Sequence, residues 1–194
     1  MSAVKNSVSL SELEYLQYEL TREIKHELIA GQAYAMAGAS RNHGLISSNT
    51  SRKFANHLEN TSCMTFIADM KVKANTNFFY PDVMVVCNEQ ASDEYYTDSP
   101  SLIVEVLSKS TRKHDETTKL LSYINIPSLQ EYVLIQQDFV DIQVIRRNEG
   151  WLPKHYFLGD DITFESIALT LPVEDIYHRV KNEDMLDFLQ EKSE

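Results

Sequence analysis

The sequence predicts a domain of the α/β class in the broad sense. Because its sheet is expected to be mixed, with helices on its flanks, it is also described as α+β. SLIVEVLS, residues 101–108, is almost continuously apolar, as a strand covered on both faces should be. EYVLI, residues 131–135, is a second short buried strand of the same kind. Predicted helices at about 42–58 and 117–126 are interleaved with these strands. This order favours a mixed sheet with helices on its faces.

The N-terminal part is predicted to contain a short helix, a hairpin and a long helix. Ser11 and Glu14 have the spacing of a capping box, so the short helix starts there. HELIAGQAYAM, residues 26–36, is predicted to be a strand, a tight turn and a return strand. From about residue 42 to residue 58, five residues that would share one face of a helix recur at roughly helical intervals. They are Leu45, Ile46, Asn49, Phe54 and Leu58.

The middle of the chain is predicted to be rich in strands. Residues 63–86 are expected to form a strand, a short turn and two further strands. Residues 88–100 are polar and acidic without periodicity, which predicts an exposed loop. After the strand at 101–108, the helix at 117–126 ends at Pro127, because proline cannot continue a helix.

The C-terminal part is predicted to be strands followed by charged helices. FVDIQVIRR, residues 139–147, alternates as a strand does, and a turn at 148–150 leads into WLPKHYFLG. From about residue 172 the chain is expected to be helical and charged. The length of 194 residues suits one domain, assigned here to residues 1–194.

Composition excludes several classes of protein. No apolar stretch approaches the roughly 18 residues of a membrane span, and no signal-peptide core is present, so we expect a cytoplasmic protein without a membrane partner. Cys63 and Cys87 are expected to be reduced thiols, and no cysteine or histidine cluster indicates zinc. The formal net charge of −11 argues against a general nucleic-acid coat, but not against a local phosphodiester site at which metal ions offset carboxylates.

Two carboxylates stand in segments that otherwise look buried. Asp82 follows Pro81 and opens the apolar run VMVV, and Glu105 lies in the middle of SLIVEVLS. A carboxylate in an apolar strand costs several kcal/mol unless it is paired or binds a metal. A salt bridge or a place at a strand end would satisfy either one alone. If the strands are neighbours, the two carboxylates converge and suit a hard cation such as Mg²⁺.

The same residues carry a family resemblance. An aspartate, a loop and a glutamate inside a hydrophobic strand form the signature of the PD-(D/E)XK nuclease superfamily, whose PD is Pro81–Asp82 here. Within it the chain resembles the Uma-type family of restriction endonucleases from about residue 13 to about residue 178. The matching stretches are KHELIAGQAYAMAGAS, IADMKV, YPDVMVVC, SLIVEVLSKST, DETTKLLSYINIPSLQEYVLI and a late GW.

The resemblance implies a restriction-endonuclease-like core and a metal-dependent endonuclease acting on DNA, with RNA left open. It implies Mg²⁺ or Mn²⁺ held by the Asp82 and Glu105 carboxylates and the carbonyl of Val106. It also implies a homodimer, because such enzymes commonly pair two sites to cut two strands. The alternative is a non-enzymatic binding or assembly module that retains the fold.

One departure from the superfamily pattern concerns the lysine expected two residues after the glutamate, where this chain has Leu107. The resembling family has a lysine on the following helix, which makes Lys119 the candidate to orient or activate water. The alternatives for Lys119 are a solvated lysine or an ion pair with Asp115 at i, i+4. Three other lysines are rivals: Lys71, Lys109 and Lys113.

Glu27 matches a recurrent glutamate of the family and is a candidate catalytic residue near the metal, or else a solvated glutamate at a strand end. His43 is expected to be a capping or loop histidine. Tyr123, Tyr132 and the aromatic run Phe78–Tyr80 are expected to be core residues, with stacking on bases as the alternative for the aromatic run. The acidic residues expected in turns or solvated loops are Asp69, Asp93, Glu94 and Asp98.

Overall fold

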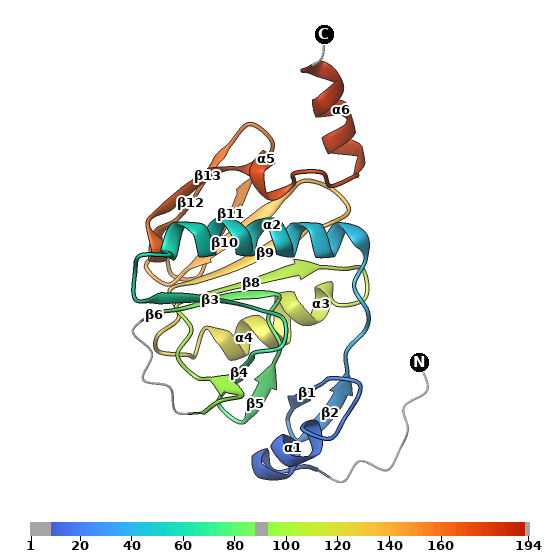
Figure 1. Ribbon diagram of the computed structural model, residues 1–194, viewed down its shortest axis with the longest axis vertical. Coiled ribbons are helices and arrows are strands. Elements are labelled where there is room, and N and C mark those ends of the chain that lie inside the picture. The colour runs from blue at the N-terminus through green and yellow to red at the C-terminus, as the bar shows by residue number, and fades with distance from the viewer. Residues whose placement is uncertain (1–8, 88–92, 193–194) are drawn as a thin grey trace.

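A six-stranded mixed sheet forms the centre of the molecule (Figure 1). The computed structural model describes residues 9–87 and 93–192. The strand order is β11-β10-β9-β8-β6-β3. Neighbouring strands are antiparallel except β8 and β9, which run parallel, so the predicted mixed sheet is confirmed. The bounds are β3 Cys63–Ile67, β6 Val83–Cys87, β8 Leu102–Leu107, β9 Glu131–Gln136, β10 Ile142–Arg146 and β11 Pro153–Tyr156.

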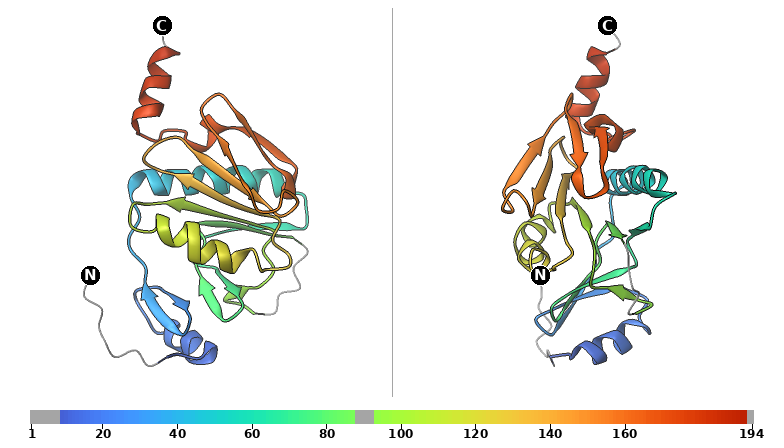
Figure 2. Two further views of the ribbon diagram at one scale, coloured as in Figure 1. Left: turned by 180° about the vertical axis from the view of Figure 1, so that it is seen from behind. Right: turned by 90° about the vertical axis from the view of Figure 1, so that its left-hand side faces the viewer.

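Helices cover both faces of this sheet (Figure 2). α2, Arg41–Leu58, packs on one face. A continuous helical segment covers the other, made of α3 (Arg112–His114), the π-helical turn η1 (Asp115–Lys119) and α4 (Leu120–Tyr123). Side chains of β8 alternate between the two cores, because successive residues of a strand point to opposite faces. Leu102, Val104 and Val106 pack toward α2, whereas Ile103 and Leu107 pack toward α4.

A second, five-stranded sheet lies beside the first and carries the N-terminal helix. Its order is β2-β1-β5-β4-β7. α1, Glu12–Glu19, begins at Ser11 with the predicted capping box, and Tyr15 packs on Phe78 with ring centroids 5.2 Å apart. This packing holds α1 on the second sheet, in which Phe78 of β5 pairs with Leu28 of β1. The bounds are β1 His26–Ile29, β2 Gln32–Ala35, β4 Lys71–Ala74, β5 Asn77–Phe79 and β7 Tyr96–Thr97.

The C-terminal part is a hairpin followed by two helices. β12, Asp161–Phe164, pairs with β13, Leu169–Pro172, and α5, Val173–Ile176, follows directly. The Asn49 amide on α2 donates to the carbonyls of Ile176 and His178, at 3.0 and 2.9 Å. α6, Glu183–Glu191, projects from the body (Figure 1). Among the described residues, no helix combines the length and the apolar character needed to cross a membrane.

Two expectations about strands were wrong, and one hairpin was missed. Residues 63–86 contain four strands rather than three. β7 lies in the stretch predicted to be a loop, of which residues 88–92 lie outside the described residues. The hairpin β12–β13 was not predicted. Short strands such as β7 are stabilised by distant partners, here β4, so local periodicity does not reveal them.

The expectation of reduced thiols was also wrong, because Cys63 and Cys87 form a disulfide. The two residues lie directly opposite each other in the antiparallel pair of β3 and β6. Sequence spacing does not show this register, since 24 residues separate the two cysteines. The bond ties the edge strand β3 to the strand that Asp82 precedes.

Reduction of this disulfide is expected to lower the free energy of unfolding by about 3 kcal/mol, because the unfolded chain regains the conformational freedom of a closed loop. Urea unfolding with and without a phosphine reductant measures the difference. The Cys63→Ser, Cys87→Ser double variant is the control. It should be insensitive to reductant and as stable as the reduced wild-type chain. Equal stability of the oxidised and reduced wild-type chains would contradict the expectation.

Candidate active site

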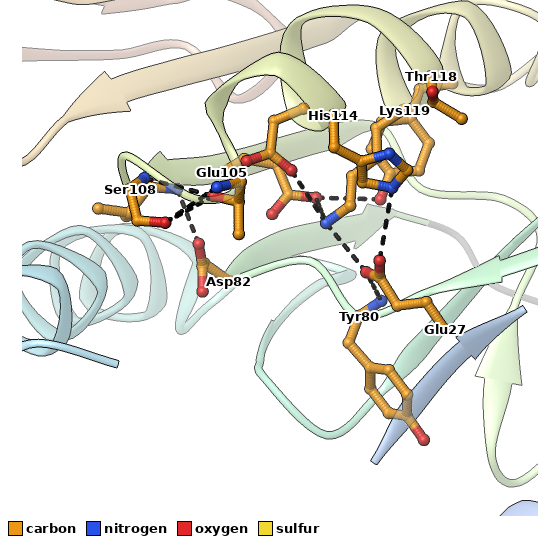
Figure 3. Close-up of polar contacts among 12 residues, drawn as sticks. Glu27, Tyr80, Asp82, Glu105, Ser108, His114, Thr118 and Lys119 are labelled. Carbon is orange, nitrogen blue, oxygen red and sulfur yellow. Dashed lines mark hydrogen bonds and ion pairs between the residues drawn. The ribbon is translucent and has the colours of Figure 1, made fainter. Parts of the chain in front are cut away.

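A buried ammonium group lies at the centre of the candidate site (Figure 3). Lys119 Nζ lies 3.0 Å from Glu105 Oε1, 3.0 Å from Glu27 Oε1 and 3.3 Å from Asp115 Oδ1. The lysine is only 5% exposed, and all three carboxylates are buried as well. One cation is therefore shared by three anions away from bulk water.

These four groups come from three elements. Glu105 stands on β8, on the face of the sheet that the helical segment covers. Asp115 and Lys119 are the first and last residues of η1, where the N–H of Leu120 donates to the Asp115 carbonyl five residues earlier. Such single π turns are frequent at functional sites. Glu27 comes from β1, so the second sheet completes the cluster.

Hydrogen bonds from buried aromatic residues hold the carboxylates of Glu105 and Glu27 and the backbone of Asp115. The Tyr123 hydroxyl donates to Glu105 Oε1 at 3.1 Å, and the Tyr132 hydroxyl donates to the Asp115 carbonyl at 3.1 Å. The backbone N–H of Tyr80 donates to Glu27 Oε1 at 3.2 Å. Both Tyr123 and Tyr132 are core residues, as predicted, but their hydroxyls reach the site.

Asp82 lies at the start of β6 and faces the backbone of the Glu105 strand. The N–H of Val106 donates to Asp82 Oδ2 at 2.7 Å (Figure 3). His43 Nε2, from the first turn of α2, lies 3.2 Å from the same oxygen. The expectation of a capping or loop histidine was wrong, because it is the Ser40 side chain that caps α2, accepting from the His43 N–H.

The charges of the cluster are strongly coupled. Burial raises the pKa of Glu105 well above its ordinary value; Lys119 opposes this, and Asp115, Asp82 and Glu27 reinforce it. Burial likewise raises the pKa of Asp115. The pKa of Lys119 is raised well above its ordinary value because its three carboxylates outweigh the effect of burial. Burial therefore favours the neutral forms of Glu105 and Asp115, whereas Lys119 keeps its charge.

Comparison with known proteins identifies the family of this chain and a solved structure with the same fold. The Uma2 family model, described as "Putative restriction endonuclease", matches residues 13–174. The chain belongs to the Uma2 family. It is 40% identical over 174 residues to protein slr1290 of Synechocystis sp. (strain ATCC 27184 / PCC 6803 / Kazusa), an uncharacterized protein, covering 87% of this chain and 91% of the relative. The uncharacterized protein sll1609 of the same organism is 37% identical over 142 residues, with coverage of 71% and 80%.

A solved structure shares the fold of this Uma2 chain. It is the crystal structure of a protein from Anabaena variabilis ATCC 29413, described as a putative nuclease belonging to DUF820. The TM-score is 0.74 over 87% of this chain and 97% of the other, at 17% sequence identity. The likeness confirms the nuclease-like α+β fold that the sequence predicted.

The Uma2 match spans every candidate residue named from the sequence, whereas α6 lies beyond it. The donors that the resemblance assigns to a divalent cation are the Asp82 and Glu105 carboxylates and the Val106 carbonyl. They fit Mg²⁺ or Mn²⁺ chemically, because these ions take oxygen ligands. Among the described residues, no three acidic, histidine or cysteine side chains converge as a metal-binding group. A cation here would therefore depend on the backbone carbonyl and on ligands from solvent or substrate.

The structure separates Lys119 from its rivals. Lys109 and Lys113 are exposed. Lys71 is buried, but its ammonium lies over the rings of Tyr80 and Tyr95, at 5.2 and 5.8 Å from their centroids. Lys119 is the one of the four that contacts Glu105. It does form the i, i+4 ion pair with Asp115, but it is not the solvated lysine of the other alternative.

Asp115 is a member of the cluster in its own right, although the sequence suggested only an ion-pair partner for Lys119. Its spacing to Lys119 and Tyr123 on one helical face is the signal that could have found it. Phe78 and Phe79 are buried core residues, as expected. Asp69 lies in a turn, as expected, and pairs with Lys25. Of the predicted acidic loop residues, Asp93 accepts from the N–H of Tyr95, and Glu94 and Asp98 are exposed.

Proposed function

We propose that this Uma2 protein is a metal-dependent endonuclease that hydrolyses phosphodiester bonds in DNA. The observation that carries the proposal is the ammonium of Lys119, 3.0 Å from Glu105 Oε1 although the usual lysine position holds Leu107. Glu105 on its strand and the Asp115–Lys119 pair on the helical segment are thereby in direct contact. Mg²⁺ or Mn²⁺ would be held by Asp82, Glu105 and the Val106 carbonyl.

The proposal gives a role to the cation and to each of three residues of the candidate site. When bound, the cation supplies positive charge that polarises the phosphoryl group. Lys119 orients the attacking water and offsets charge on the scissile phosphate. Glu27, through its contact with Lys119 Nζ at 3.0 Å, holds the ammonium in that position. The Tyr123 hydroxyl holds the Glu105 carboxylate in place by donating a hydrogen bond to it.

Positive side chains near the site support an anionic substrate despite the net charge of −11. A surface hollow of about 490 Å³ lies at the first turn of α2, next to His43 in the chain. Arg41 and Lys109 contribute two positive charges to this hollow, against one negative charge from Asp138. Such groups bind the phosphates of nucleic acid without reading its sequence. DNA is therefore proposed as the substrate, with RNA as an outcome that the test distinguishes.

Cleavage assays test the proposal directly. Supercoiled plasmid, single-stranded DNA and RNA are each incubated with the purified chain in Mg²⁺, in Mn²⁺ and in EDTA. We expect cleavage of DNA that EDTA abolishes and that Asp82→Asn reduces strongly. Asp161→Asn, an exposed aspartate on β12, is the matched control and should cleave normally. Cleavage of RNA alone would correct the substrate, and no cleavage of any substrate would favour the non-enzymatic module.

One observation favours that second reading, a binding or assembly module. Lys119 is already paired with three carboxylates, and Asp82 accepts from Val106 and contacts His43, so protein groups alone provide partners for the cluster. A structural cluster of this kind would hold the two sheets together without a cation. Metal binding to the folded chain therefore distinguishes the two readings.

Divalent cations are expected to stabilise the folded chain under the first reading. A ligand at a hundredfold excess over its Kd adds about 2.7 kcal/mol to the free energy of unfolding. Thermal melts in millimolar MgCl₂ or MnCl₂ are compared with melts in NaCl of equal ionic strength. The increase should be absent in Asp82→Ala and present in the exposed control Asp161→Ala. Equal melting temperatures in the two salts would argue for the structural module.

The homodimer is part of the proposal, with α6 as its contact. Leu186 and Leu189 on α6 are more than half exposed, and Phe157, also exposed, lines a hollow with Phe188 of the same helix. Light scattering at micromolar concentration should give twice the chain mass of 22.3 kDa. Leu186→Glu should shift the mass to that of one chain, whereas Leu152→Glu, on an exposed turn, should not. A wild-type mass of one chain would rule the dimer out.

We also propose a cytoplasmic location, as the sequence suggested. The Cys63–Cys87 disulfide is unusual for that compartment, where thiols are kept reduced. Thiol alkylation at the moment of cell lysis, followed by mass analysis, would show the oxidation state in the cell. Fractionation of the same cells would give the location.

A further inference from the structure

Lys71 is a buried cation that the candidate site does not use. It opens β4 in the second sheet and is only 6% exposed. Burial lowers the pKa of Lys71, although Glu19 and Asp93 attract its charge from a distance. In the part of the chain that the structure describes, no carboxylate forms an ion pair with this ammonium, and the oxygens of Glu19 and Asp93 accept hydrogen bonds from other groups. A buried charge without a direct partner is costly, so the ammonium would gain from an anion supplied by a ligand.

The ammonium lies between the interior and the surface. Its Nζ is 5.2 Å from the centre of the Tyr80 ring, which is 4% exposed. It is 5.8 Å from the centre of the Tyr95 ring, which is 48% exposed. The two rings attract the cation through their π faces but carry no net negative charge, so they do not neutralise it. An anion bound against the exposed Tyr95 is within reach of the ammonium.

Tyr80 connects Lys71 to the candidate site. Its backbone N–H donates to Glu27 Oε1 at 3.2 Å, while its ring points away from the cluster (Figure 3). It is followed directly by Pro81 and Asp82 in the chain. Lys71 and the candidate site therefore lie on two sides of one residue. Because phosphates repeat along a nucleic-acid strand, a strand bound at the candidate site has further phosphates available for Lys71.

We propose that Lys71 binds a backbone phosphate of a single-stranded DNA segment and that the exposed ring of Tyr95 stacks on a base of the same segment. This inference rests on the proposed function for its ligand, and it adds a binding site and a preference for unpaired bases. Sites for single strands combine positive charge along the backbone with aromatic rings on which bases stack. The bases of a duplex stay stacked on one another, so a duplex offers none to Tyr95.

Equilibrium binding in EDTA tests the phosphate contact without any need for cleavage or for a metal. Fluorescence anisotropy of a labelled single-stranded DNA of mixed sequence is followed over a range of NaCl concentrations. Lys71→Met should reduce the magnitude of the slope of log K against log[NaCl] by about 0.7, because one phosphate contact is lost. Lys71→Arg keeps the charge and should keep the wild-type slope. Thermal melts confirm that each variant is folded.

Lys73→Met is the matched control on the same strand. It changes the net charge by the same amount, but the Lys73 ammonium is already paired with Glu12 at 2.6 Å. Its slope should therefore equal that of the wild-type chain. An equal change of slope in both variants would show a general effect of net charge and would overturn the assignment of Lys71.

Tyr95→Leu provides the second readout at an exposed position, which keeps the test valid if Lys71→Met fails to fold. Loss of one stacked base should weaken single-strand binding about 5- to 150-fold and leave binding of the matched duplex unchanged. Tyr34→Leu is the control, because Tyr34 on β2 is also exposed and should contribute nothing to binding.

The outcomes separate this inference from the proposed function. An unchanged slope in Lys71→Met, unchanged single-strand binding in Tyr95→Leu, or no binding by the wild-type chain would overturn the inference. Cleavage of plasmid in Mg²⁺ would still support the proposed function in each of these cases. Binding that depends on Lys71 and Tyr95, without cleavage in any divalent ion, would support the inference and contradict the nuclease.

Discussion

Replacing Lys119 by methionine is expected to lower the free energy of unfolding by about 3–5 kcal/mol. The reason is that the substitution leaves the carboxylates of Glu27, Glu105 and Asp115 buried without their shared cation. Breaking a buried ion pair from one side is far more costly than removing an exposed charge. Urea unfolding at pH 8 measures the loss. Lys113→Met is the matched control, because Lys113 is exposed on α3, and it should change stability by no more than about 0.5 kcal/mol.

The deficit of Lys119→Met should depend on pH in a definite direction. Without the ammonium, the pKa values of the three carboxyls rise, and those of Glu105 and Asp115 are already raised by burial in the wild-type chain. A carboxyl whose pKa is raised by folding stabilises the fold below its unfolded value, and this stability is lost as the pH rises through the folded value. The deficit should therefore shrink as the pH falls from 8 toward 5. A deficit below about 1 kcal/mol at pH 8 would show that the cluster is not held by this lysine.

Replacing Glu105 by glutamine is expected to have opposite effects on activity and on stability. Loss of the carboxylate should reduce cleavage by at least about a hundredfold, since even groups that only support metal ligands cost 10- to 100-fold when removed. Without divalent ions at pH 7–8, the free energy of unfolding should rise by about 0.5–2 kcal/mol, as is common when a functional site carries unfavourable charge. The physical cause is the raised pKa of Glu105, which shows that the folded chain favours the neutral form.

The sign of the stability change can be checked by pH as well. As the pH falls, the Glu105 carboxyl of the wild-type chain takes up a proton and its cost disappears, so the advantage of the glutamine variant should diminish. Glu131→Gln is the matched control at a buried glutamate on the neighbouring strand. Glu131 is paired with Arg146 at 3.0 Å, so its loss should destabilise the chain and leave cleavage unchanged. Stabilisation by both substitutions, or by neither, would contradict the reading of Glu105 as a strained functional charge.

Local patterns in the sequence were sufficient for several features of the fold and the site. The capping box at Ser11 and Glu14 and the helix from Arg41 to Leu58 depend on residues close together in the chain. Glu105 stood out because a carboxylate in an apolar strand requires a partner, and its partner is Lys119, only fourteen residues later. Features of this kind are predictable, since short-range spacing determines which face of an element a side chain occupies.

By itself the sequence determined the mixed sheet with flanking helices, whereas the site formed by Asp82, Glu105 and Lys119 stays a prediction. Only the tertiary structure decided that Glu27 joins Lys119, that His43 faces Asp82, and that Cys63 bonds Cys87. Each of these contacts depends on how two distant elements pair or pack. Strand register and the placement of one element on another arise from the packing of the whole core, and the spacing of residues along the chain carries little information about them.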